Sequence, residues 1–386
     1  MAVLLKVDHA EFLRDYWQQR PLLIRGGLAQ FEDPIAPELL AGLAMEEGVD
    51  ARIIQRQDTD WHVEHGPFED YEEFGEADWT LLVQAVNEWF PDVQNLLLPF
   101  RFLPDWRVDD VMVSFATENG SVGAHLDQYD VFIIQGTGQR HWRVGERLEG
   151  AEEFCPHPDL KQLRNSDFAT CIDTVLQPGD VLYIPAGCPH HGVALEPSLN
   201  YSIGFRAPNS AEWLAQLADQ LLASEQNFPR YRDPQLSAET APYLISTNEV
   251  AQVKQLLLQQ LESESGLQAI QQVMSQAKRP LPQPEREITL VELASYATTE
   301  MLLCRTPGAR LLLGCDGKLY ANGECVAAPA QMSDGFQELL QLDQEVPLAD
   351  CKAVFADTAA LSCLAELLNL GVLHLVQELA EDEATD

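Results

Sequence analysis

The sequence predicts an α+β protein, with a central jelly-roll or barrel of short β-strands preceded and followed by helices. Short apolar runs separated by Gly, Pro and Asn fill the region from about residue 110 to residue 205, and this spacing is typical of such barrels. Apolar residues at helical spacing occur on both sides of this region. At 386 residues the chain is longer than one hydrophobic core usually serves, so we expect two or three domains.

The segment before the barrel predicts helices and strands in alternation. Asp8 can cap a first helix, Leu22–Ile24 has the composition of a strand, and a short helix is expected after Pro37. Residues 51–65 are expected to form a hairpin. A clearer helix is predicted from Asp78, because the apolar residues that follow it have helical spacing. These residues are Trp79, Leu82, Val83, Val86 and Trp89.

Six strands are predicted for the barrel itself, because each is a short β-branched or aromatic run bounded by turn residues. They cover residues 111–117, 129–135, 140–144, 173–176, 181–184 and 199–205.

The last part of the chain predicts two further units. Residues 209–279 suit a helical hairpin with apolar stripes, which packs either on its own domain or on a partner subunit, and the sequence alone does not choose. Prolines 280, 282 and 284 favour an extended linker. Residues 285–386 combine helices with a small β-hairpin and so resemble a winged helix, but they are rich in Asp and Glu, which argues against DNA binding.

The net charge of −37 limits the partners that we expect. It argues against direct binding to nucleic acid, because a phosphate backbone requires a surface of Lys and Arg. It suits a basic protein partner, and it equally suits high solubility or a salty habitat. The eight cysteines form no CxxC pair, and the sequence has no signal peptide or membrane-spanning apolar run, so we expect a cytoplasmic protein.

Two histidines and a carboxylate indicate a metal site in the barrel. Residues two apart on a strand face the same way, so His125 and Asp127 are expected to project together. His190 ends a G-x5-P-x-G-x2-H sequence that is typical of the second half of a cupin barrel. Two histidines with one carboxylate form the facial triad of Fe(II) oxygenases. Singly, these residues also suit a surface ion pair or a core histidine; their order and spacing together favour iron. His191 is the competing ligand, but it is expected to face away.

Further polar residues on the predicted strands suit a dicarboxylate cosubstrate. Arg140 follows His125 by fifteen residues, and its guanidinium can hold the distal carboxylate of 2-oxoglutarate. Asn200 and Ser202 share one strand face, and Ser114 lies on the first barrel strand, so all three are candidate cosubstrate contacts. Each also suits an ordinary satisfied polar group, and Arg140 also suits an exposed strand residue.

The chain resembles the bacterial YcfD (RoxA) type of JmjC-domain ribosomal oxygenase. The resemblance is carried by residues 125–138, Arg140, and residues 142–145, 155–160 and 200–208, with further matches at 40–46, 81–87 and 319–324. It covers nearly the whole chain, although residues 220–285 match only in character. Relatives carry Lys at the position of Arg140, and Cys188-Pro189-His190-His191 differs from the residues that relatives place beside the ligand.

The resemblance implies a JmjC double-stranded β-helix in residues 1–208, with its barrel core at about 92–208. It also implies a helical dimerisation region at 209–279 and a winged-helix-like domain at 285–386. Iron(II), 2-oxoglutarate and O2 are the implied cofactor and cosubstrates, with His125, Asp127 and His190 as metal ligands and catalytic residues and Arg140 as the cosubstrate anchor.

The implied reaction is hydroxylation of an arginine β-carbon in a basic protein, the sixteenth of the large ribosomal subunit, by a homodimer. Three alternatives remain open at this point. The same fold serves N-methyl-lysine demethylases, some cupin enzymes use a metal without 2-oxoglutarate, and a binding scaffold needs no catalysis. Arg140 argues against the second alternative, and the complete ligand set argues against the third.

Overall fold

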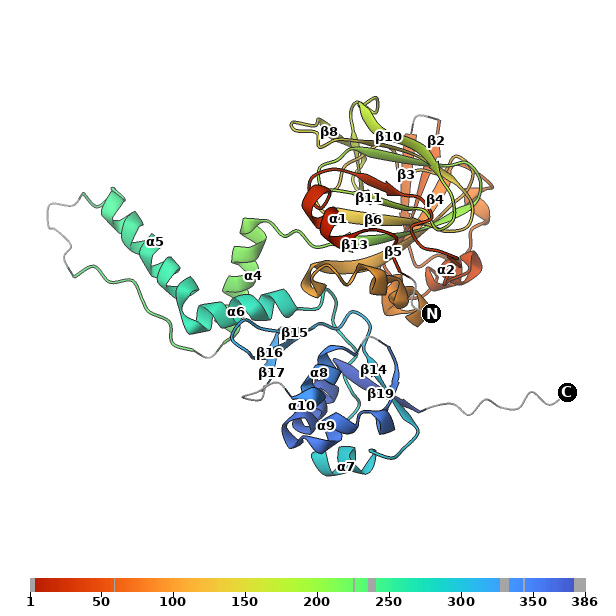
Figure 1. Cartoon of the computed structure of the whole chain (residues 1–386). Coiled ribbons are helices and arrows are strands. Elements are labelled where there is room, and N and C mark those ends of the chain that lie inside the picture. Colours follow the sequence, from red (N-terminus) through yellow and green to blue (C-terminus); the bar gives the residue numbers. More distant parts are fainter. Residues whose placement is uncertain are drawn as a thin grey trace. The chain divides into compact units, whose positions relative to one another are not determined.

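The computed structural model describes residues 4–58, 60–224, 226–234, 241–326, 333–342 and 344–377. The chain divides into two compact units, Met1–Ala207 and Pro208–Asp386. Figure 1 shows that strands dominate the first unit, whereas the second begins with helices. No helix in the described part of the chain has the length and apolarity needed to cross a bilayer.

The first unit is built on an eight-stranded antiparallel sheet. Its strands, in spatial order, are β1 (Leu22–Ile24), β11 (Val181–Ile184), β6 (Asp130–Gln135), β13 (Ser198–Phe205), β5 (Val108–Ala116), β4 (Trp79–Val83), β2 (Ala51–Gln57) and β3 (Asp60–His65). Neighbours such as β11 and β6 are far apart in sequence, because the chain passes through a second sheet between them.

The second sheet contains β10 (Thr170–Leu176), β7 (Arg140–Gly145) and β12 (His190–Ala194), in that order. Side chains from both sheets pack together between them, among them Ile133 from β6, Leu182 from β11 and Val144 from β7. The two sheets therefore form a double-stranded β-helix, as predicted. The connection between β7 and β10 carries a separate hairpin of β8 (Glu153–His157) and β9 (Leu160–Leu163).

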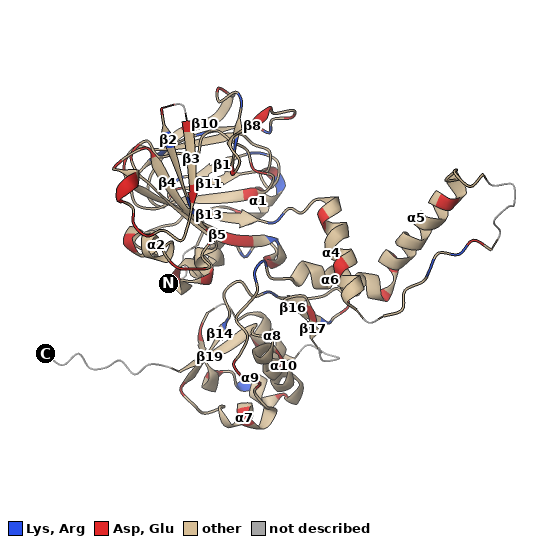
Figure 2. Ribbon diagram, turned by 180° about the vertical axis from the view of Figure 1, so that it is seen from behind, with Lys and Arg blue, Asp and Glu red and all other residues tan. Residues whose placement is uncertain are grey.

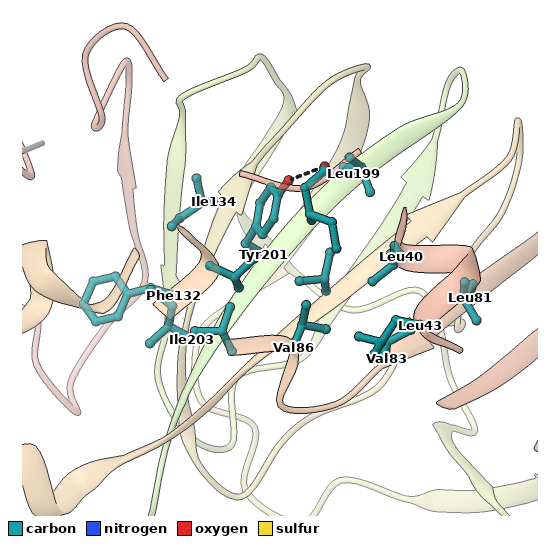
Figure 3. Close-up of a cluster of buried hydrophobic side chains, with 14 of the residues drawn as sticks. Leu40, Leu43, Leu81, Val83, Val86, Phe132, Ile134, Leu199, Tyr201 and Ile203 are labelled. Atoms are coloured by element: carbon teal, nitrogen blue, oxygen red, sulfur yellow. Dashed lines mark hydrogen bonds between the residues drawn. The ribbon is translucent and has the colours of Figure 1, made fainter. Parts of the chain in front are cut away.

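The outer face of the large sheet is also buried, because N-terminal helical segments cover it. Helices α1 (His9–Asp15) and α2 (Pro37–Leu43) contribute apolar side chains to one core with the outward-facing residues of β6, β13 and β4. Figure 3 shows Leu40 and Leu43 of α2 close to Leu81 and Val83. Burial on both faces explains why strands such as β6 are apolar along their length, without polar alternation.

The helix predicted from Asp78 is wrong: residues 79–83 form strand β4, and only Val86–Glu88 form a short 3-10 turn, η2. All five residues of β4 are buried, because Leu82 faces one side of the sheet and Leu81 faces the helical layer. A strand that is buried on both faces is apolar throughout, and its residues coincide with helical spacing by chance.

The second unit begins with helices, as predicted, but there are three capped helices rather than a simple hairpin: α4 (Ser210–Ala223), α5 (Thr247–Glu262) and α6 (Glu264–Ser275). Helix α6 is hydrogen-bonded to the small sheet that follows it. Gln272 donates to Gly323 O at 3.0 Å, and the Ser275 hydroxyl accepts from Gly323 N at 3.1 Å. The helical region and the C-terminal domain are therefore packed as one unit, on both sides of the predicted linker.

The C-terminal domain has one apolar core beneath short helices and two small sheets. Residues 319–326 form two strands joined by a turn at Asn322 and Gly323. The remaining elements are α7 (Leu290–Ser295), β14 (Met301–Arg305), β15 (Leu311–Leu313), β16 (Leu319–Ala321), β17 (Glu324–Val326), α8 (Asp334–Leu340), β18 (Val346–Pro347), α9 (Lys352–Ala356), α10 (Thr358–Asn369) and β19 (Leu373–Gln377).

Acidic residues cover both units (Figure 2). The chain has 61 Asp and Glu against 24 Lys and Arg. The segment from Asp58 to Asp78 holds nine Asp and Glu, all exposed, and has no Lys or Arg. The surface of the first unit is therefore suited to positively charged partners.

Candidate metal centre

The three predicted metal ligands meet at one end of the barrel. One donor atom from each of His125, Asp127 and His190 lies within 4.8 Å of the others. His190 Nε2 lies 3.6 Å from Asp127 Oδ2. His190 is the first residue of β12, whereas the other two lie between β5 and β6, so the barrel connects ligands that are 63 residues apart in sequence.

His125 and Asp127 do not lie on a regular strand, which corrects the premise on which they were paired. His125 forms an isolated antiparallel bridge with His190, and Asp127 follows in a loop. Backbone bonds still hold both: His125 N donates to His190 O at 3.0 Å, and Asp127 O accepts from Gly187 N at 2.7 Å. The donor atoms of both side chains are thereby brought into one group with His190.

Each imidazole is oriented by a backbone carbonyl. His125 Nδ1 lies 2.9 Å from Gly123 O, and His190 Nδ1 lies 3.0 Å from Cys188 O. A ring that donates from Nδ1 has its lone pair on Nε2, which is the arrangement that a metal ligand requires. The two rings are close, with centroids 4.2 Å apart.

The protonation equilibrium of His190 also suits a metal ligand. The pKa of His190 is lowered to about 4, mainly by burial and then by the nearby His125, while Asp127 opposes the shift. The imidazole is therefore neutral at pH 7 without a metal. The competing His191 lies opposite Arg143 on the other face of the sheet, and it is not part of the ligand group.

Arg140 is buried on β7 and directed at the large sheet. Its Nε donates to the Ser198 hydroxyl and its Nη1 to the Ser114 hydroxyl, both at 2.9 Å. Its Nη2 donates to the backbone carbonyls of the same two serines, also at 2.9 Å. Among the described residues, no carboxylate lies within ion-pair distance, and burial lowers the pKa of Arg140 to about 9. A buried cation without a counter-ion is a suitable site for an anionic ligand.

Asn200 lies beside this cation with an unsatisfied amide. It is paired in register with Ser114 on one side and Gln135 on the other, so the three side chains share the inner face. Neither Oδ1 nor Nδ2 of this buried side chain has a hydrogen-bond partner within the described residues. Ser202 lies on the same face, two residues along β13 and opposite Ile133. Its role as a cosubstrate contact remains a prediction.

Two residues of this site were missed in the sequence. Ser198 was detectable, since it shares a strand face with Asn200 by simple alternation. Trp142 lies between Arg140 and the metal ligands, with its ring centroid 6.1 Å from that of His190. Its buried Nε1 has no hydrogen-bond partner among the residues that the structure describes. Nothing in the local pattern distinguishes Trp142 from an ordinary core tryptophan.

Negative charge acts on Tyr129, which follows the predicted metal ligand Asp127 by two residues. Tyr129 is 44% exposed. The pKa of Tyr129 is raised above its ordinary value. The largest cause is the negative charge of Asp127, and burial and the charges of Asp110 and Asp109 act in the same direction. The electrostatic environment of this ring is therefore negative.

The residues present fit both an iron(II) ion and 2-oxoglutarate. The donor set of two imidazoles and one carboxylate is the facial triad of non-haem iron(II) oxygenases. The unpaired Arg140 cation and the orphaned Asn200 amide provide the charge and the hydrogen bonds that a dicarboxylate requires.

Comparisons with known proteins support the same assignment. A model of the JmjC domain matches residues 95–213, and a model of the ROXA-like winged helix matches residues 232–374. The ribosomal protein uL16 3-hydroxylase of Escherichia coli is 42% identical over 95% of this chain and 97% of its own length. A probable ribosomal oxygenase of Haemophilus influenzae is 34% identical over 81% of this chain and 80% of its own length.

Solved structures agree with the sequence relatives. The X-ray structure of Escherichia coli YcfD superposes with a TM-score of 0.88 at 41% identity, covering 97% of this chain and 100% of that one. YcfD in complex with cobalt and 2-oxoglutarate gives a TM-score of 0.85 at 39% identity, covering 97% and 99% of the two chains.

Proposed function

The chain belongs to the bacterial YcfD-type JmjC-domain ribosomal oxygenases, and on this premise we propose that it hydroxylates the β-carbon of an arginine in ribosomal protein uL16. Iron(II) and 2-oxoglutarate would serve the reaction, giving succinate and CO2. The observation that carries the proposal is the barrel that holds three metal ligands and a buried, unpaired arginine together.

The protein's own residues supply binding and orientation. His125, Asp127 and His190 would hold the metal on one face, leaving the remaining positions for cosubstrate and O2. Arg140 would bind the distal carboxylate of 2-oxoglutarate, with Ser114 fixing the guanidinium and Asn200 bonding the cosubstrate. When bound, iron(II) and 2-oxoglutarate supply the oxidising chemistry that the side chains lack.

The charge distribution supports a basic protein substrate. The carboxylates whose negative charge raises the pKa of Tyr129 make the electrostatic potential beside the metal centre favourable for an entering guanidinium. The exposed acidic segment 58–78 and the net charge of −37 would attract a lysine- and arginine-rich protein and repel free nucleic acid. This surface is also compatible with high solubility, so the substrate experiment below decides.

We also propose that the chain is a homodimer through the helical region 209–279. Helix α5 buries no residue, although it carries an apolar stripe that includes Val250, Val253 and Leu257. A helix with an apolar stripe is normally covered, and a second copy of the same region is a suitable cover. Leu257→Glu should halve the mass measured by light scattering; an unchanged mass would contradict this interface.

Two other reactions are testable alternatives. A JmjC protein that demethylates N-methyl-lysine would release formaldehyde, and a cupin metalloenzyme without a cosubstrate would not convert 2-oxoglutarate. Arg140 favours a 2-oxoglutarate enzyme over the second alternative. The eight unpaired cysteines are consistent with a reducing compartment, and we propose the cytoplasm.

The deciding experiment incubates the protein with iron(II), 2-oxoglutarate, O2 and uL16, and then measures peptide masses. A gain of one oxygen on an arginine is expected, together with succinate. No gain, with turnover of 2-oxoglutarate intact, would reject the substrate and keep the enzyme class. His190→Ala should abolish turnover, whereas His191→Ala serves as the matched neighbouring control. The reverse result would reject the ligand assignment.

A further inference from the structure

The segment 121–125, which leads into His125, is held on one side by β12. The Ser121 hydroxyl donates to Gly192 O at 2.6 Å, and His125 and His190 exchange backbone bonds of 2.8 and 3.0 Å. The histidine pair is an isolated bridge outside any regular ladder. Strand β12 therefore holds Ser121 and His125. The backbone carbonyl groups of Val122 and Ala124 bond to another element.

That element is β9, on the opposite side of the segment. Leu163 N donates to Ala124 O at 2.8 Å, and Gln162 Nε2 donates to Val122 O at 2.9 Å. The Gln162 residue is only 6% exposed. The β8–β9 hairpin, which is an insertion between two barrel strands, is therefore the outer neighbour of the segment that carries the first metal ligand.

The Gln162 amide also packs directly against Gly123, the residue that orients the ligand ring. Gly123 has a left-handed φ of +82°, and a Cβ built on it would lie 2.1 Å from Gln162 Nε2. The carbonyl of this same glycine lies 2.9 Å from His125 Nδ1. The Gln162 amide therefore bonds the carbonyl of Val122 and fills the space beside Gly123. It thereby restricts the Gly123 peptide, whose carbonyl oxygen orients the His125 imidazole.

The two histidine ligands differ in how much support they have. His190 begins β12, which is paired along its whole length with β7. His125 has no strand of its own, so its position depends on side-chain and bridge contacts. From this contrast we propose that Gln162 is a positioning residue that holds His125 in the geometry required for metal binding. The inference rests on the assignment of His125 as a metal ligand.

The test measures Co(II) binding to the metal-free protein, with no substrate or cosubstrate present. Gln162→Met keeps an unbranched side chain but removes the N–H donor. We expect Co(II) to bind about tenfold more weakly, the lower end of the effect of losing an outer-shell partner, because Gln162 acts on His125 through Gly123. The visible absorption spectrum of bound Co(II) should also change, because it reports the coordination geometry. A merely structural role would lower the melting temperature and leave that spectrum unchanged.

Controls separate the inference from the assignment beneath it. Lys161→Met introduces the same residue next door on β9, at an exposed site, and should leave affinity and spectrum as in the wild type. His125→Ala should nearly abolish binding; if it did not, the ligand assignment itself would fail. Gln162→Glu keeps the length and shape of the side chain and serves if Gln162→Met does not fold. Wild-type affinity and an unchanged spectrum in either folded variant would overturn the proposal.

Discussion

Replacing Asn200 by leucine should raise the stability of the ligand-free protein and weaken binding of 2-oxoglutarate. Both polar atoms of the Asn200 amide are buried and have no hydrogen-bond partner in the described part of the chain. A buried unsatisfied polar group costs about 1–3 kcal/mol, so removing the amide should stabilise the protein by about 2 kcal/mol. Leucine has a similar branched shape, and apolar neighbours such as Ile133 lie on the same inner face.

The same change should reduce cosubstrate affinity, because two hydrogen bonds to 2-oxoglutarate would be lost. At about 1 kcal/mol each, this loss corresponds to roughly 30-fold weaker binding. Calorimetric titration of 2-oxoglutarate into the Co(II) form measures the affinity, and thermal unfolding of the ligand-free form measures the stability. Asn95→Leu, at an exposed position, is the control and should leave both the affinity for 2-oxoglutarate and the melting temperature unchanged. Wild-type affinity in Asn200→Leu would refute the reasoning.

Three other perturbations test different parts of the site. Arg140→Gln removes the only buried charge that we assign to the cosubstrate, so calorimetry should detect at least 100-fold weaker binding of 2-oxoglutarate; weakening below tenfold would reject the anchor. Gly192→Ala places a Cβ 2.7 Å from the Trp142 ring, and the displaced indole should lower 2-oxoglutarate turnover while the melting temperature falls by only a few degrees; unchanged turnover would show that Trp142 does not border the cosubstrate. In the metal-free protein the pKa of His190 is lowered from 6.5 to about 4. As the pH falls, His190 is therefore protonated in the unfolded chain at a higher pH than in the folded protein. About 3 kcal/mol of folding stability should be lost as the pH falls from 6.5 to 4. Melting curves over this pH range check the sign, and His190→Gln should flatten them.

Six barrel strands could be predicted because each is a short run between turn residues, and Val181–Ile184 was predicted to the residue, whereas strand β12 was not predicted. The prediction failed at Trp79–Val83, where burial on both faces removed the polar alternation that marks a strand. It also missed the β8–β9 hairpin, whose Cys155 and Lys161 are exposed and whose sequence has little apolar periodicity. Local pattern is informative where one face is polar, and it is ambiguous where both faces are buried or both are exposed.

The candidate site divides in a similar way. Residue type and spacing were sufficient to select His125, Asp127, His190 and Arg140, because few side chains can bind iron or hold a dicarboxylate. Sequence order was also sufficient to prefer His190 to His191, since adjacent residues of a strand face opposite ways. These inferences depend on chemistry and on alternation, both of which are local properties.

Three-dimensional packing was needed for everything that depends on which strands are neighbours. Only the pairing of β5, β13 and β6 brings Ser114, Asn200 and Gln135 into one row, and only the approach of β7 supplies Arg140 to that row. The support of His125 by Gln162 likewise arises between segments some forty residues apart. Strand register is a property of long-range contacts, so local composition identifies the chemical groups, and the fold determines which of them act together.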